Sequence, residues 1–125
     1  MDYADLITLA HGVARPIYPS ETCQAGTVGA AIVSSSGKTY TGICLDFACS
    51  LGFCAEHAAI AEMLKCQESE ISLLVAVTHD GNVLPPCGRC REMMWQLSAA
   101  NKDAMIILSV NEAQPLRDLL PFAYC

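Results

Sequence analysis

Two apolar runs, residues 72–78 and 104–110, constrain the fold more than any other feature of the sequence. Each has the length of a strand and almost no polar residue, which is typical of a strand whose two faces are both covered. A sheet that contains such strands needs a layer of other structure on each side. The two runs therefore predict the centre of a sheet enclosed between helices.

The remaining segments supply those helices and further strands. Residues 28–33 and 39–45 flank the Ser-rich turn that ends at Gly37 and predict a hairpin, whereas residues 16–26 and 46–53 have no regular pattern. Helical spacing or composition predicts helices over residues 3–13, 54–66, 88–97 and 116–120. This order predicts an α/β fold, a three-layer α/β/α arrangement with a mixed sheet of about five strands, in a single domain over residues 1–125.

The overall composition limits the kinds of partner. Hydrophobic residues make up 53% of the chain and charged residues 16%, an apolar balance that predicts a buried interface in a homo-oligomer. The net charge of −6 argues against a nucleic-acid partner, whose phosphates need clustered Lys and Arg, and favours a small neutral substrate. The first residues show neither a basic lead-in nor a long apolar run, so we expect no signal peptide, no membrane partner and a cytoplasmic location.

The chain has eight cysteines, which in a cytoplasmic protein do not indicate a disulfide framework. Three of them fall in two short fragments that are considered next. The other five are predicted to pack in the core as small apolar residues: Cys23, Cys44, Cys49, Cys66 and Cys125.

The two fragments are Cys54-Ala55-Glu56 and Pro86-Cys87-Gly88-Arg89-Cys90, and each begins a predicted helix. Zinc prefers thiolate ligands in a tetrahedron, and a catalytic site uses three protein ligands and leaves the fourth position for water. Helix N-termini also favour thiolates. Two such helix starts that face each other would hold Zn²⁺ through Cys54, Cys87 and Cys90.

Glu56 shares a helical row with Ile60, Met63 and Leu64, so its carboxylate is predicted to be partly buried. Burial raises the pKa of a carboxyl group and a nearby cation lowers it, and a carboxylate poised in this way can act as a general acid and base. Glu56 is therefore the candidate catalytic residue. Its place in the first helical turn is the simpler explanation of the same position.

Two other interpretations use the same cysteines. A Cys-x-x-Cys pair alone is also typical of thiol redox proteins, although such a pair needs neither Cys54 nor a buried carboxylate. A structural zinc module that binds partners would need a fourth protein ligand, for which Cys44, Cys49 or Cys66 are candidates.

The two fragments resemble the three-cysteine form of the cytidine deaminase superfamily, and similar segments at Val28 to Ile32 and Leu119 to Pro121 extend the resemblance. It implies attack of zinc-activated water on C4 of a pyrimidine, with Glu56 transferring the protons and ammonia leaving. The resemblance implies a cytosine nucleoside as substrate, a role in pyrimidine salvage, and a homotetramer.

The resemblance also implies roles for residues around the zinc site. Ala55 and Pro86 would offer backbone groups to the base edge. His57, where many relatives carry Arg, and Arg91 would offset the charge of the three thiolates. Tyr124 lies where relatives place an aromatic residue that closes the site, often the site of a neighbouring subunit.

The sequence departs from these relatives on the sugar side of the expected pocket. Cytidine deaminases usually present Asn-x-Glu to the ribose hydroxyls, and this chain has Cys44-x-Asp46 there, a weaker hydrogen-bonding pair. An aromatic residue expected just before Val28 is replaced by Ala25 and Gly26. Cytidine leads by family frequency, and a nucleoside antibiotic of the blasticidin S type, or another aminated heterocycle, is the alternative. An editing deaminase that acts on nucleic acid is disfavoured by the acidic charge.

Overall fold

A twisted mixed sheet forms the middle layer of the computed structural model, which describes residues 1–125. Its centre is β2 (Cys23–Ser34), which pairs antiparallel with β3 (Thr39–Phe47) on one side and with β4 (Ile71–Thr78) on the other. Next to β4 lies β6 (Met105–Ser109), the one parallel neighbour, followed by β7 (Glu112–Pro115) at the edge. Two short strands complete the sheet: β1 (Ile17–Ser20) pairs with the start of β2, and β5 (Val83–Leu84) pairs with the end of β4.

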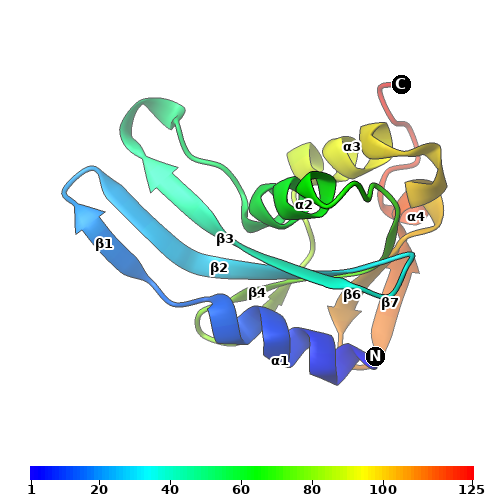
Figure 1. The fold of residues 1–125 in the computed structure, drawn as a ribbon, viewed down its shortest axis with the longest axis horizontal. Coiled ribbons are helices and arrows are strands. Elements are labelled where there is room, and N and C mark those ends of the chain that lie inside the picture. The colour runs from blue at the N-terminus through cyan, green and yellow to red at the C-terminus, as the bar shows by residue number, and fades with distance from the viewer.

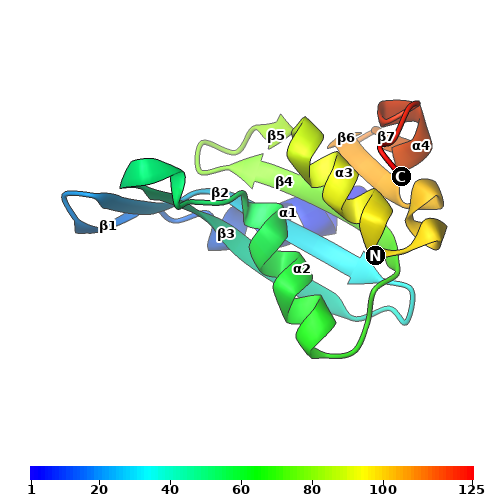
Figure 2. The same cartoon turned by 90° about the horizontal axis from the view of Figure 1, so that it is seen from above.

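Helices cover both faces of this sheet, as predicted (Figure 1). One face carries α1 (Tyr3–Val13), and the other carries α2 (Ala55–Lys65) and α3 (Gly88–Leu97), with α4 (Leu116–Leu119) beside them. Figure 2 shows α2 and α3 lying side by side across the strands, each with its first turn toward the same end of the sheet. None of the helices has the length and apolar character needed to span a bilayer.

The central strand β4 has apolar side chains in both layers of the core. Leu74 packs in the cluster beneath α2 and α3, whereas Leu73, Val75 and Val77 pack in the cluster beneath α1. Every residue of this strand from Leu73 to Val77 is buried. The prediction of a strand covered on both faces is therefore confirmed.

The sheet has seven strands, two more than the five or so expected, because short edge strands carry no alternating pattern. All four residues of β1 are exposed and one is Pro19, so this segment was expected to be irregular. In β7 the edge position tolerates Pro115. The segment expected to be irregular after residue 45 begins as strand, because β3 continues through Phe47.

The prediction that the unclustered cysteines pack in the core is correct for Cys44, and Cys23 is half-buried. It is wrong for Cys49, Cys66 and Cys125, which are exposed. These three lie in the 3₁₀ turn after β3, at the carboxyl end of α2 and at the end of the chain, where no other layer covers them.

One glycine allows α2 to approach the sheet closely. A Cβ atom at Gly42 in β3 would lie 2.4 Å from the backbone nitrogen of Ala59 and 2.7 Å from the carbonyl oxygen of Ala55. Any larger side chain would push the helix away. The position of the first turn of α2, and with it of Cys54, depends on this contact.

Candidate metal centre and active site

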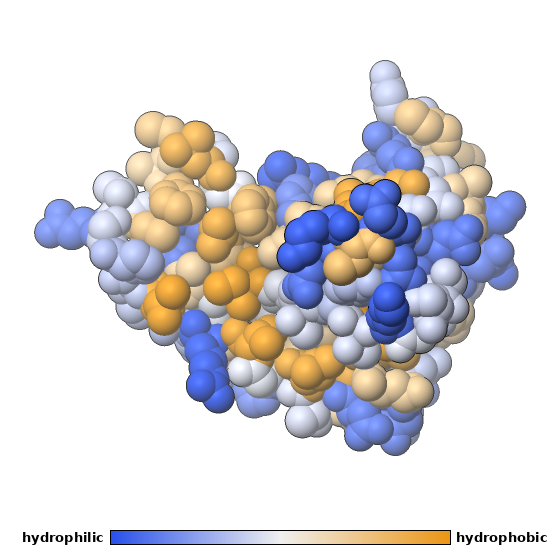
Figure 3. All heavy atoms as spheres, viewed as in Figure 1, coloured by the Kyte–Doolittle hydropathy of each residue, from blue (hydrophilic) through white to orange (hydrophobic).

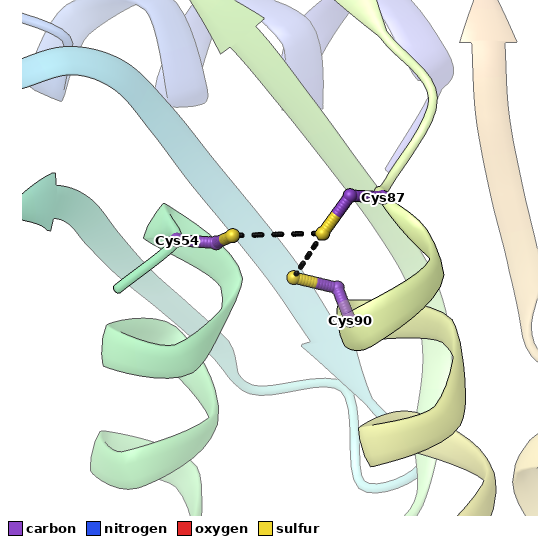
Figure 4. A group of neighbouring side chains, drawn as sticks. All are labelled: Cys54, Cys87 and Cys90. Atoms are coloured by element: carbon purple, nitrogen blue, oxygen red, sulfur yellow. Dashed lines mark hydrogen bonds between the residues drawn. The ribbon is translucent and has the colours of Figure 1, made fainter. Parts of the chain in front are cut away.

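The first turns of α2 and α3 bring three cysteine sulfurs together (Figure 4). Cys54 and Cys87 are the N-cap residues of the two helices, and Cys90 lies one turn into α3. The Sγ atoms of Cys54 and Cys87 are 3.6 Å apart, and those of Cys87 and Cys90 are 3.5 Å apart. All three lie within 4.8 Å of one another.

This spacing fits a single zinc ion. Three thiolates at about 2.3 Å from Zn²⁺ in a tetrahedron would have their sulfurs about 3.8 Å apart. The group contains no fourth Cys, His, Asp or Glu. Three soft donors with one position left over are the ligand set of a catalytic zinc site, rather than of a structural one.

The candidates for a fourth sulfur ligand lie elsewhere. The Cys44 sulfur is occupied by the backbone N–H of Val28 at 3.3 Å and the Thr27 hydroxyl at 3.1 Å. Cys49 and Cys66 are exposed and do not belong to the group. The geometry therefore does not supply the fourth ligand that a four-cysteine module requires.

The three thiols differ in their acidity. Burial raises the pKa values of Cys54 and of Cys90, and the charge of Glu56 raises both further. Burial also acts on Cys87, but the backbone N–H groups of Cys90 and Arg89 and the neighbouring thiols outweigh it, so the pKa of Cys87 is lowered. Of the three thiols, Cys87 therefore loses its proton most easily, and a bound divalent cation would deprotonate all three.

Glu56 is only 4% exposed, in agreement with the burial predicted from its helical row. Burial raises the pKa of its carboxyl group, while its own backbone N–H and the Cys90 thiol act in the opposite direction. Glu56 lines the same cavity as Cys54 and Cys87, and its charge raises the pKa of both Cys54 and Cys90, so the carboxyl group lies close to the sulfur group. A buried carboxylate next to a metal centre is suited to accept and return protons.

A cavity of about 510 Å³ opens onto this group. Its lining divides into two zones. The floor consists of the buried lining residues Cys44, Ala55, Glu56 and Ala76, taken together with the sulfur group of Cys54, Cys87 and Cys90. The rim consists of other lining residues with exposed side chains, which are Asp46, Phe47, Ser50, Leu84, Pro85 and Arg89.

Several residues predicted for the substrate line this cavity. Ala55 lies on the floor beside Glu56, and Cys44 and Asp46 line the wall formed by β3. The Cys44 sulfur lies 4.0 Å from a carboxylate oxygen of Asp46. The structure therefore brings the Cys44-x-Asp46 pair into the pocket, where the resemblance expects the sugar.

Other predicted residues lie outside the lining. Pro86 is buried, and its carbonyl oxygen accepts a hydrogen bond from Arg91 Nε at 2.8 Å. Arg91 also donates from its Nη1 to the carbonyl oxygen of Leu119 at 3.1 Å, so both of these side-chain hydrogen bonds go to backbone carbonyls rather than to the sulfurs. Tyr124 is 87% exposed at the end of the chain.

His57 lies in the first turn of α2, next to the cavity wall. Its ring stacks on Phe53, with centroids 5.8 Å apart, and its buried Nε2 has no hydrogen-bond partner. Burial lowers the pKa of His57, and the charge of Arg89 lowers it further. The imidazole is therefore held toward its neutral form.

Among the lining residues that the sequence reasoning missed are Thr27, Phe47, Phe53 and Arg89. Phe47, the last residue of β3, and Phe53 give the pocket aromatic walls from residues 46–53. They take the place of the aromatic residue that was expected just before Val28, where the chain has Ala25 and Gly26. Residues 46–53 were expected to be irregular, so nothing in their pattern placed these rings. In the sequence Arg89 lies between the predicted zinc ligands Cys87 and Cys90, and this position was the one indication that it would lie near the site.

A mixed sheet between helical layers, with three sulfurs at two helix N-termini and a buried carboxylate beside them, defines a zinc hydrolase of the α/β/α class. A family model described as the cytidine and deoxycytidylate deaminase zinc-binding region matches residues 2–106. The cytidine deaminase of Mycobacterium tuberculosis is 33% identical over 98 residues, which cover 78% of this chain and 71% of that protein.

Solved structures agree with this match. A crystal structure of cytidine deaminase from Mycobacterium tuberculosis is similar with a TM-score of 0.84 at 28% identity, over 100% of this chain and 98% of that one. The cytidine deaminase of Burkholderia pseudomallei is similar with a TM-score of 0.79 at 26% identity, over 99% and 100% of the two chains. The chain belongs to the cytidine and deoxycytidylate deaminase family.

Proposed function

We propose that the protein is a zinc-dependent hydrolase that converts a cytosine nucleoside and water into the uracil nucleoside and ammonia. The observation that carries this proposal is the placement of a buried Glu56 beside three sulfurs on the floor of a cavity of nucleoside size. Zinc, when bound by Cys54, Cys87 and Cys90, supplies a Lewis acid that lowers the pKa of water.

The protein's own residues have separate proposed roles in proton transfer and in holding the base. Glu56 accepts a proton from water and delivers protons to the ring nitrogen and to the departing amine, so its pKa has to lie near the working pH. Ala55 and Ala76 on the floor are buried and have small apolar side chains, so they are proposed to leave room for the base and to give it an apolar contact. Backbone groups of Ala55 are proposed to hold the base edge. Pro86 is proposed to assist through its carbonyl oxygen, its one backbone hydrogen-bonding group, and Arg91 keeps the Pro86 loop in place through its hydrogen bond to that same carbonyl.

A screen for ammonia release tests the proposal directly. The purified zinc protein is incubated with cytidine, deoxycytidine, cytosine, blasticidin S and other aminated bases. Release from at least one cytosine nucleoside, with about one zinc ion per chain, is the expected result. Full activity in Glu56→Ala would exclude the mechanism.

The rival from another class, a structural zinc module, is distinguished by the metal's ligands. Zinc-edge absorption spectroscopy should show three sulfurs and one lighter atom for the enzyme. Four sulfurs would favour the interaction module.

The sugar side of the pocket favours a second candidate substrate. Because the Cys44 sulfur already accepts a hydrogen bond from the Val28 N–H and shares another with the Thr27 hydroxyl, it has little left to offer a ribose hydroxyl. A nucleoside antibiotic of the blasticidin S type, whose sugar lacks the ordinary ribose hydroxyls, fits this wall. The same screen ranks the two substrates by kcat/KM.

We also propose that the protein assembles as a homotetramer, lies in the cytoplasm and takes part in pyrimidine salvage. The support for the homotetramer is exposed apolar surface: Ile17, Phe47 and Leu51 have exposed side chains. Figure 3 shows hydrophobic groups, in orange, gathered on the left, on the side where β1 and the end of β3 project. At the other end of the molecule Phe122 and Tyr124 are 91% and 87% exposed. Light scattering should give four times the mass of one chain, and a monomeric mass would exclude the assembly.

A further inference from the structure

Thr27 places a hydroxyl group in the cavity that the proposed mechanism does not use. The residue lies in β2 and is half-buried, so its exposure lies between that of the floor and that of the rim. Its Oγ1 atom lies 3.1 Å from the Cys44 sulfur, which is the one side-chain hydrogen bond that Thr27 makes within the chain. The carbonyl oxygen of Thr27 accepts a hydrogen bond from the His79 N–H at 2.9 Å, so the backbone behind this hydroxyl is fixed to the end of β4.

An irregularity in β2 directs this side chain toward β3. The register of β2 against β3 shifts between Ala25 and Gly29, so the residues between them leave the regular ladder. A bulge of this kind re-aims side chains and is often found next to an active site. Here the Val28 N–H donates to the Cys44 sulfur at 3.3 Å, and the Thr27 hydroxyl contacts the same sulfur. The bulge therefore brings Thr27 and Cys44 together on one wall of the cavity.

Gly26 makes this path of the chain possible and excludes an aromatic residue at its own position. Its φ is +82°, a left-handed conformation that favours glycine, and a Cβ atom there would overlap the carbonyl oxygen of Arg15. The chain thus has no room at Gly26 for the aromatic residue that was expected just before Val28. The next residue, Thr27, offers the cavity a hydrogen-bonding group instead.

The hydroxyl of Thr27 has hydrogen-bonding capacity that the neighbouring thiol lacks. A hydroxyl has one donor and two acceptor positions, whereas a thiol is a weak donor and a weak acceptor. If the Cys44 thiol donates to Thr27, the hydroxyl keeps its proton and one lone pair for a ligand. If Thr27 donates to the sulfur, the hydroxyl keeps both lone pairs. In either arrangement Thr27 can accept a hydrogen bond from a hydroxyl group of a ligand.

We propose that Thr27 is a specificity-determining residue whose hydroxyl recognises a hydroxyl group on the sugar of the substrate, a role for which Cys44 has little capacity left. The base has to reach the floor beside Glu56 and the sulfurs, so the sugar lies toward the rim, along the wall that contains Thr27, Cys44 and Asp46. This proposal rests on the proposed deaminase function. It narrows the substrate to nucleosides that keep a sugar hydroxyl, in preference to those that lack one.

The test compares cytidine, 2′-deoxycytidine, 3′-deoxycytidine and 2′,3′-dideoxycytidine, which differ only in two sugar hydroxyls. Wild-type protein should prefer at least one hydroxylated substrate over the dideoxy compound in kcat/KM. Thr27→Val keeps the shape of the side chain and should lower this preference by about two- to tenfold, the size of one neutral hydrogen bond, mainly through KM. Thr27→Ser should keep most of the preference. The two monodeoxy substrates show which hydroxyl is recognised.

Two further variants locate the effect at Thr27. Thr39→Val is the matched control, because Thr39 is also a strand threonine but is exposed at the start of β3 and does not line the cavity. It should retain both the activity and the preference. Cys44→Ala should retain the preference, whatever its activity. A preference that is lost in Cys44→Ala but unchanged in Thr27→Val would assign the recognition to the sulfur and overturn the proposal.

A binding measurement separates this proposal from the proposed function. Calorimetry with uridine and 2′,3′-dideoxyuridine needs no turnover, and wild-type protein should bind uridine more tightly, with a difference that shrinks in Thr27→Val. If no cytosine compound is deaminated, the deaminase function fails and this comparison still tests Thr27. Wild-type protein that does not bind uridine more tightly overturns the proposal. An equal loss for all four substrates in Thr27→Val also overturns it, because Thr27 would then only support the wall of the cavity.

Discussion

The floor and the rim of the cavity differ in how the fold holds them. On the floor, Cys90 and Ala55 are fully buried and Glu56 nearly so, and each is fixed within the first turn of a helix that packs on the sheet. On the rim, Asp46 and Arg89 are exposed. From this difference we expect the buried floor to determine the reaction and the exposed rim to determine which compound is admitted.

The largest effect is expected from Cys90→Ala, which removes the buried ligand from the floor. Zinc content should fall far below one ion per chain and deaminase activity should be lost, because two thiolates do not complete the site. Metal analysis after dialysis, together with the ammonia assay, checks both. Cys125→Ala removes an exposed thiol and should retain zinc and activity. Retention of full zinc by Cys90→Ala would show that the floor is not organised around the metal.

Glu56→Gln should lower kcat by about 10²- to 10⁴-fold, the usual contribution of a general acid and base, with zinc retained. The change preserves the shape of a side chain that is 4% exposed, so the floor should remain packed. Steady-state kinetics and metal analysis on the same preparation separate the two properties. Loss of zinc together with activity would instead assign Glu56 to the metal ligands.

Asp46→Asn alters the rim and should have a smaller effect. We expect KM to rise by about tenfold or less with little change in kcat, because the residue is exposed and hydrogen bonds to a charged group contribute modestly there. Asp118→Asn, on α4 and also exposed, is the control for the lost charge. If kcat fell while KM stayed constant, the division between floor and rim would be wrong.

Glu68→Gln is expected to change neither the floor nor the rim of the cavity, since Glu68 lies beyond the carboxyl end of α2. There its carboxylate accepts hydrogen bonds from the hydroxyl groups of Tyr40, Ser34 and Ser36. The hydrogen bonds from Ser36 and Tyr40 lower the pKa of Glu68 below its usual 4.5. A lowered folded-state pKa adds stability above the unfolded pKa, and this stability is lost as the pH falls through the folded pKa.

Thermal unfolding of wild-type protein and Glu68→Gln at several pH values checks this prediction. Tm should be a few degrees lower for the variant at pH 7, and the gap should close in acid. A gap that is constant with pH would assign the effect to packing. The ammonia assay at pH 7 should give the same kcat for both proteins.

The sequence predicted the floor well and the rim poorly, for physical reasons. Cys54, Glu56, Cys87 and Cys90 belong to short fragments at helix starts, so local spacing is enough to bring them together. The rim depends on contacts between distant segments. Phe53, for example, reaches the cavity because its segment folds back, with an isolated bridge between Leu45 and Phe53.

The same reasoning explains which helices and strands could be predicted from the sequence and which could not. The strands β4 and β6 follow from continuous apolar runs, and the three longer helices follow from helical spacing or composition, since each of these patterns extends over several residues. The short strands β1, β5 and β7 exist because a neighbouring strand offers hydrogen bonds at that position. Two to four residues contain too little pattern to reveal this in advance.

Two consecutive residues of α3 attach the end of the chain to the metal helix. Arg91 donates to the carbonyl of Leu119, and Glu92 accepts the backbone N–H of Tyr124 at 2.8 Å. The last residues of the chain thereby support the first turn of α3, where Cys87 and Cys90 lie. A protein shortened after Pro115 would keep every proposed zinc ligand and Glu56 yet lose both anchoring points, so fusion tags and truncations at this end would alter the metal centre from a distance.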